Sequence, residues 1–218
     1  MGIQDRKKRE KNLRCQQIQR AAKELFLLKG FNSTTIEDIA KKAELSPATI
    51  YLYFKSKDEL FASLNFITLQ YLVDEMKKVY DNKSLSPKEK MLKFKEGMYK
   101  TYKYDPLMLR NIMHIQLEDT LSVISEELIN KLNSLSQKGM SMIAEVYEEG
   151  VRQGKFIKGH GMAHADIMWG IFTGLLLWEE SKRRLNPKKD FLRPTLDRAF
   201  DIFCRGIEKS NSGIASEK

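Results

Sequence analysis

The sequence predicts an all-α fold with about nine helices. Its 218 residues include only five Pro and 12 Gly, so few positions are placed to break a helix. Apolar residues recur at intervals of three and four along nearly the whole chain, which is the spacing of one helix face. Polar breaks and capping residues divide this pattern into three helices in residues 1–57 and a larger group in residues 58–210. We therefore expect an N-terminal three-helix domain followed by a larger helical domain.

The first 57 residues carry most of the positive charge. They hold 13 Lys and Arg against six Asp and Glu, within a chain whose formal net charge is +9. A basic excess confined to one part of a chain is typical of a nucleic-acid-binding domain. The segment before the first apolar helix is itself basic and contains Arg6, Lys7, Lys8, Arg9, Lys11 and Arg14. It is either a frayed, solvated tail or a further contact to the phosphates or minor groove of DNA.

A first short helix is expected from about residue 35 to residue 43. Thr34 and Thr35 offer hydroxyl caps at its start, and Glu37 and Asp38 lie in the first turn, where the helix dipole favours negative charge. Apolar side chains at helical spacing form one buried stripe: Ile36, Ile39, Ala40 and Ala43.

A second short helix is expected directly afterwards. Ser46 is placed to cap it, Pro47 suits its first position, and Ile50 points inward. Two short helices joined by a tight turn predict a helix-turn-helix, which inserts its second helix into the major groove of DNA. Lys55 and Lys57 follow at the exit and suit phosphate. The outward positions that can reach phosphates and base edges are Pro47, Ala48, Thr49, Tyr51, Leu52 and Tyr53.

Residues 18–64, IQRAAKELFLLKGFNSTTIEDIAKKAELSPATIYLYFKSKDELFASL, resemble the N-terminal domain of the TetR family of bacterial transcriptional regulators. The resemblance implies a homodimer that binds a pseudo-palindromic operator in double-stranded DNA and represses until a small-molecule effector releases it. It also implies that the second short helix contacts the groove, while Thr35 and Lys57 reach the DNA backbone. The expected DNA-binding residues are Thr35, Ser46, Pro47, Ala48, Thr49, Tyr51, Leu52, Tyr53, Lys55 and Lys57.

One position departs from the family pattern. Glu44 lies at the turn position that the family most often fills with Gly. A non-Gly residue with positive φ there costs about 1 kcal/mol, a cost that a stable domain tolerates.

Six further helices are predicted beyond residue 57. Their breaks are the polar stretch 82–87, the Asp-Pro pair at residues 105–106, the glycines at 150 and 154, and the Asn-Pro pair at residues 186–187. The expected ranges are 58–81, 87–104, 105–117, 122–153, 162–184 and 191–208. Residues 211–218 are polar, and we expect a disordered tail.

The last two helices are expected to form the dimer interface. Residues 167–178 are apolar almost all round, so this helix must be covered on most sides. Gly170 and Gly174 would let another backbone come close. The alternative is an intramolecular core alone, but the family resemblance implies a four-helix interface with a second copy. The expected interface residues are Ile171, Gly174, Leu175, Trp178, Leu196, Ala199, Phe200 and Phe203.

Met and aromatic residues gather in the middle of the chain and predict an adaptable apolar effector pocket. The alternative for each of them is a plain core position. A loose similarity to regulators of fatty-acid metabolism points to a fatty-acyl effector, and an aromatic cation is the competing class. The wider alternative is a constitutive architectural DNA-binding protein without an effector. The expected pocket residues are Phe66, Met98, Tyr99, Tyr102, Met108, Met113, His114, Met142, Trp169 and Phe172.

No pattern of residues indicates catalysis, a metal or a cofactor. His160 and His164 are spaced for a shared metal, but Gly159 and Gly161 flank the first one and no further ligand lies at metal spacing. Cys15 and Cys204 stand alone, which fits neither a disulfide framework nor a zinc site. The longest apolar run is shorter than the roughly 20 residues that cross a bilayer. We expect a cytoplasmic regulator that is not an enzyme and does not enter the membrane.

Overall fold

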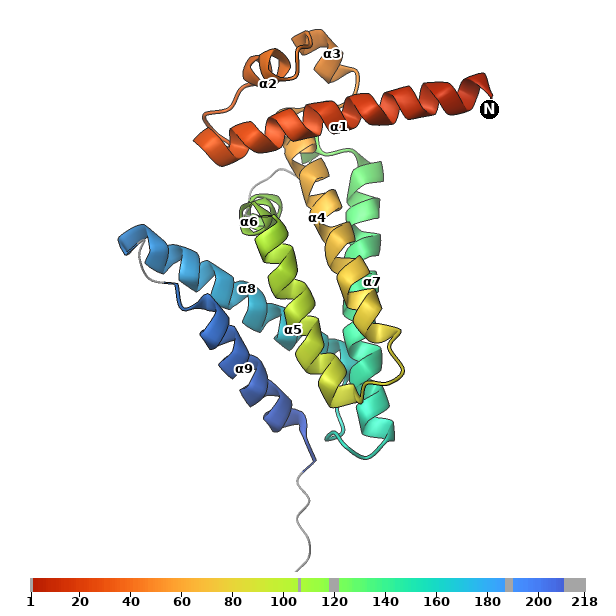
Figure 1. Ribbon diagram of the computed structural model, residues 1–218, viewed down its shortest axis with the longest axis vertical. Helices are drawn as coiled ribbons and strands as arrows, with labels where there is room; N and C mark the ends of the chain where they lie inside the picture. Colours follow the sequence, from red (N-terminus) through yellow and green to blue (C-terminus); the bar gives the residue numbers. More distant parts are fainter. Residues whose placement is uncertain (1, 106, 118–121, 187–189, 210–218) are drawn as a thin grey trace, which may run out of the picture. The chain divides into compact units, whose positions relative to one another are not determined.

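The computed structural model describes residues 2–105, 107–117, 122–186 and 190–209. Within these ranges the chain forms nine α-helices and no strand, which confirms the all-α class (Figure 1). None of the described helices is both long and apolar enough to span a membrane. The expected tail, residues 211–218, lies outside the described residues. The helices are α1 (Ile3–Lys29), α2 (Ile36–Lys42), α3 (Pro47–Tyr51), α4 (Lys57–Tyr80), α5 (Pro87–Tyr104), α6 (Met108–Leu117), α7 (Glu126–Arg152), α8 (Gly161–Leu185) and α9 (Leu192–Ile207).

The chain divides into two compact units, and each is described separately. Unit 1 comprises residues 1–70 and 102–135, and unit 2 comprises residues 71–101 and 136–218. The core of unit 1 includes Leu60, Phe61 and Leu64 of α4 and Leu107, next to α6. The domain boundary expected at residue 57 therefore lies within a single hydrophobic core.

Helix α1 begins at Ile3, so the basic segment is helical and the alternative of a frayed tail is wrong for it. Asp5 accepts a hydrogen bond from the Gly2 backbone at the first turn. Arg6 pairs with Glu10 one turn later at 3.0 Å. Such i,i+4 pairs stabilise an exposed helix modestly. The Asp5 hydrogen bond and the Arg6–Glu10 pair stabilise the N-terminal half of α1, which lies before the apolar pattern of its second half.

Helices α2 and α3 begin at the capping residues that the sequence predicts. Thr35 caps α2, Ser46 caps α3, and Pro47 occupies the first position of α3. Glu44 has φ of 55°, and it is the one non-Gly residue with positive φ in the described part of the chain. The structure therefore confirms the strained turn. Both short helices lie on one side of α1 (Figure 1).

In unit 2, α8 and α9 pack against each other, and α5 and α7 also contribute buried side chains such as Phe94 and Tyr147. Met168, Phe172 and Leu176 line the inner face of α8 and are fully buried. Gly150 of α7 lies against the Phe156 ring, where an added Cβ would come within 2.1 Å of the ring. His160 caps α8 by accepting a hydrogen bond from the Ala163 backbone. The pair His160 and His164 thus forms a helix start, as the non-metal interpretation expects.

Candidate nucleic-acid interface

The short helix α3 is held so that one side faces solvent. The Ser46 hydroxyl oxygen accepts a hydrogen bond from the Thr49 backbone N–H at 3.1 Å, which satisfies one free donor of the first turn. Ile50 on the opposite side is fully buried. Capped at one end and anchored by Ile50, α3 presents a fixed outer face.

Most of the predicted groove-contacting residues lie on that outer face. Tyr51 is 53% exposed, and Leu52, directly after the last helical residue, is 79% exposed. Thr49 and Tyr53 are half-buried. The remaining exposed positions of the set are Ser46, Pro47, Ala48 and Lys55. The outer face is compact and mixes apolar, aromatic and hydroxyl groups, which suits base edges and phosphates.

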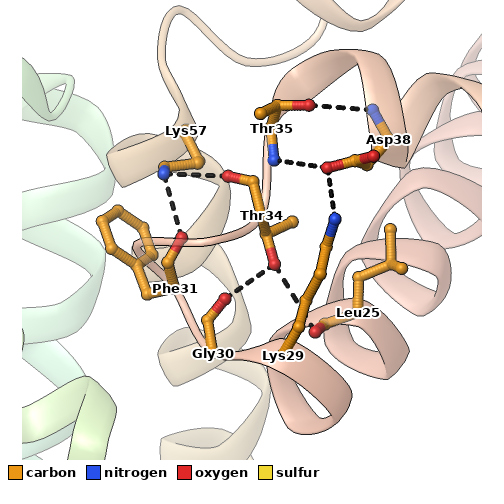
Figure 2. Close-up of polar contacts among 8 residues, drawn as sticks. All are labelled: Leu25, Lys29, Gly30, Phe31, Thr34, Thr35, Asp38 and Lys57. Atoms are coloured by element: carbon orange, nitrogen blue, oxygen red, sulfur yellow. Dashed lines mark hydrogen bonds and ion pairs between the residues drawn. The ribbon is translucent and has the colours of Figure 1, made fainter.

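A capping box fixes the start of α2 (Figure 2). The Thr35 hydroxyl oxygen accepts from the Asp38 backbone at 3.1 Å, and the Asp38 carboxylate accepts from the Thr35 backbone at 2.9 Å. The hydrogen bond from Lys29, with further bonds from Thr35, lowers the pKa of Asp38 to about 2. Because Thr35 uses its oxygen as the acceptor, its O–H remains able to donate to a phosphate.

Lys57 has partners that the sequence did not reveal (Figure 2). Its ammonium donates to the backbone carbonyl oxygens of Phe31 and Thr34, each at 2.9 Å. It also lies 4.2 Å from the centre of the Phe31 ring. Because these bonds use two of its three donors, Lys57 fastens the turn before α2 to the start of α4. The expected contact of Lys57 with a DNA phosphate stays a prediction. The third N–H of the ammonium would have to make it.

His114, expected in an effector pocket, lies in the core of unit 1. Its Nε2 is 2.9 Å from the Asp58 carboxylate. Its ring centre is 4.3 Å from that of Phe31 and 5.2 Å from that of Phe61. The structure therefore shows a paired core histidine that joins α6 to α4.

A second contact joins α6 to the rest of unit 1. Asp105, just before α6, has a buried carboxylate that pairs with Lys23 of α1 at 3.1 Å. The same carboxylate accepts a hydrogen bond from Thr68 of α4. These residues were missed by sequence reasoning, because a Lys and an Asp so far apart in the chain give no local signal.

The ten expected pocket residues are divided equally between the two units. Phe66, Tyr102, Met108, Met113 and His114 belong to unit 1, whereas Met98, Tyr99, Met142, Trp169 and Phe172 belong to unit 2. Asn111 of α6 was not expected among them. It is fully buried, and its side-chain amide has no hydrogen-bond partner among the described residues.

The expected dimer residues fall into two groups. Leu196 and Phe200 are fully buried within the single chain, and Phe203 is 9% exposed, so these three are core positions of unit 2. Trp178 is 61% exposed. Gly174 is exposed, and Ile171, Leu175 and Ala199 are half-buried. The second group is therefore the part of the expected set that exposes surface on the single chain, and the dimer interface itself stays a prediction.

Comparison with known proteins agrees with this geometry. Residues 18–64 match the model of the family described as bacterial regulatory proteins, tetR family. The HTH-type transcriptional regulator QacR of Staphylococcus aureus is 27% identical over 194 residues, which cover 86% of this chain and 95% of QacR. The fatty acid metabolism regulator protein of Bacillus subtilis is 24% identical over 151 residues, which cover 69% of this chain and 75% of that protein.

Solved structures share the fold. The TetR family transcriptional regulator PfmR from Thermus thermophilus superposes with a TM-score of 0.69 at 21% identity. The superposition covers 88% of this chain and 99% of PfmR. The all-α fold of the described residues is therefore one that solved structures share.

Proposed function

This chain belongs to the TetR family of bacterial transcriptional regulators, and we propose that it is a homodimeric repressor which a small apolar effector releases from its operator. The observation that carries the proposal is the exposed face of α3, held by the Ser46 cap and the buried Ile50. A rigid, capped helix with Tyr51 outward is suited to the major groove. The QacR relative is itself described as a transcriptional regulator.

The proposed dimer uses an apolar stripe on α8. Ile167, Trp178 and Leu185 are exposed and lie on one helix face. Gly170 and Gly174 lie on the same face, and an added Cβ at either would meet no atom of this chain within 4 Å. A contiguous exposed apolar stripe marks an interaction site. A second copy would cover it and would carry two α3 helices to successive major grooves, about 34 Å apart.

The proposed release acts through α6. Asp105 ties the start of α6 to Lys23 and Thr68, and His114 ties its later part to Asp58. An effector that binds better when α6 has moved would strain these pairs, and the movement would reach α1 and α4 directly. At saturating effector, DNA affinity then falls by the factor by which the effector binds the moved state more tightly than the DNA-binding state.

We propose a long-chain acyl compound as the effector. The support is the Met-rich and aromatic middle of the chain and the similarity to the B. subtilis regulator of fatty acid metabolism. Two test compounds distinguish the candidate effector classes. One is a long-chain acyl-CoA, and the other is the aromatic cation tetraphenylphosphonium. Release of DNA by the acyl-CoA alone supports the proposal, and release by the cation alone replaces the acyl class.

The test of the whole proposal begins with selection of operators from random DNA by the purified protein. We expect an inverted repeat with half-sites one helical turn apart. Tyr51→Ala should bind it roughly 5- to 150-fold more weakly while its circular dichroism is unchanged, because one good base contact is worth about 1–3 kcal/mol. Binding without sequence preference and without release by either compound would favour the constitutive architectural protein.

A further inference from the structure

We propose that a groove between the N-terminal half of α1 and the end of α3 seats the phosphate backbone of the bound DNA. The inference rests on the proposed DNA-binding function and extends it beyond the helix-turn-helix. Four residues of α1 and two residues that follow α3 line the groove: Lys7, Glu10, Lys11, Arg14, Leu52 and Tyr53.

The three basic residues of the groove lie on one face of α1. Lys7, Lys11 and Arg14 are spaced i, i+4 and i+7, which brings them into one row along the helix. At 1.5 Å per residue the row is roughly 10 Å long. Each strand of B-DNA carries one phosphate per roughly 3.4 Å of axis, so the row matches a short run of phosphates on one strand.

The charge of the groove is available to a ligand. Glu10, its one acidic residue, is paired with Arg6 at 3.0 Å. Lys7 and Lys11 form no ion pair within 4.0 Å in the described part of the chain, and both are exposed. Arg14 donates one hydrogen bond to Gln17 and keeps its other donors. The groove therefore presents net positive charge, which complements a phosphate backbone.

The opposite wall of the groove follows α3 in the chain. Leu52 is 79% exposed and offers an apolar surface for the methylene stems of the lysines. Tyr53 adds a phenol that can donate to phosphate. Because this wall directly follows α3, a duplex that receives α3 in its major groove brings its backbone to the groove.

The helical state of the basic segment strengthens the argument. Residues 3–29 form one continuous helix, so the cations stand in a fixed row instead of on a tail that must order when DNA binds. Preorganisation of this kind reduces the entropy lost on binding. Lys8 and Arg9 belong to the same helix but do not line the groove, which provides a matched control.

The test compares two double variants of the full chain. The groove variant is Lys7→Gln with Lys11→Gln, and the control variant is Lys8→Gln with Arg9→Gln. Each lowers the formal net charge by two from +9, and Gln keeps helix propensity close to that of Lys. Affinity for the selected operator is measured between about 50 and 200 mM salt, where the slope of log K against log salt counts the phosphates contacted.

We expect the groove variant to lower the steepness of that slope by about 2, since each phosphate contact contributes about 0.9. The control variant should change it by less than half as much. Equal changes in both variants would overturn the inference, because they would show a general effect of net charge. Failure of the unmodified protein to bind DNA would instead overturn the proposed function.

Ethylation interference on the same operator gives a second readout. The unmodified protein and the control variant should be sensitive to ethylation at the same phosphates beside each half-site. The groove variant should lose sensitivity at two or three neighbouring phosphates of one strand and keep the others. A uniform weakening at all phosphates would overturn the assignment of the groove.

Discussion

The Lys57 ammonium lies over the Phe31 ring, 4.2 Å from its centre, and donates a hydrogen bond to the Phe31 carbonyl oxygen. A cation over an aromatic ring and a charge-assisted hydrogen bond are both stronger than their neutral counterparts. Phe31 also contacts Phe26, Phe61 and His114. Lys57 therefore fixes a residue on which the core of unit 1 depends.

Lys57→Met should lower the free energy of unfolding by about 1–3 kcal/mol, because two carbonyl oxygens lose a charged donor. Lys55→Met provides the control, since Lys55 is exposed, and it should change stability by less than about 0.5 kcal/mol. Urea unfolding followed by circular dichroism measures both. If the two variants are equally stable, Lys57 has no structural role and its phosphate contact becomes its main function.

The capping carboxylate of Asp38 should give a pH-dependent contribution to stability. Its folded pKa, about 2, is below the ordinary value of 3.8 because Lys29 and Thr35 hydrogen-bond the charged form. A lowered folded pKa means that the contribution is complete above pH 3.8 and is lost as the pH falls toward 2. Asp38→Asn should therefore be less stable than the unmodified protein at pH 6 and approach it near pH 2. A difference that stays constant across this range would contradict the assignment.

The exposed glycines of α8 provide a test of the dimer. Gly174→Arg has room in the single chain, where an added Cβ meets nothing within 4 Å, so the variant should stay folded. If a second copy packs closely there, the arginine should shift the protein from dimer to monomer in sedimentation velocity. Ser134→Arg adds the same charge at an exposed position of α7 and should leave the dimer intact. A dimeric Gly174→Arg would place the interface elsewhere.

Asn111→Ala should be neutral or stabilising by up to about 1 kcal/mol. A buried amide without a partner costs about 1–3 kcal/mol, and alanine removes that cost at the expense of a few contacts. Met108→Ala, one turn earlier on α6 and equally buried, should cost about 2–5 kcal/mol. Thermal or urea unfolding of the two variants separates them. A loss at Asn111 as large as at Met108 would mean that the amide has a partner which the fold depends on.

The helix-turn-helix could be predicted in detail because its determinants are local. The Thr35 and Ser46 caps, Pro47 at the first position of α3, and the inward Ile50 all act within a few residues of the bond or contact they make. The predicted range 87–104 matches α5 because Pro87 and the Asp-Pro pair mark its ends. Signals of this kind are readable without a fold.

Other features depend on residues that are distant in sequence. Lys57 bonds to carbonyls more than twenty positions earlier, and His114 pairs with an Asp on another helix. The buried face of α9 shows the same limit. Leu196 and Phe200 face their own core while Ile202 is 57% exposed, yet all three are equally apolar in the sequence. Periodicity identifies an apolar face but does not tell which neighbour covers it.

The core of unit 1 has a consequence for protein synthesis. Ile18 and Ile50 share that core with Leu107, which is made much later. At 5–20 residues per second, a ribosome takes roughly two to nine seconds to pass from Leu64 to Leu107. During this interval the helices around α3 exist without their complete core, and the nascent chain exposes apolar surface to chaperones and proteases. Unit 1 is thus begun first but, because it also includes residues 102–135, it cannot finish folding until about three-fifths of the chain has been made.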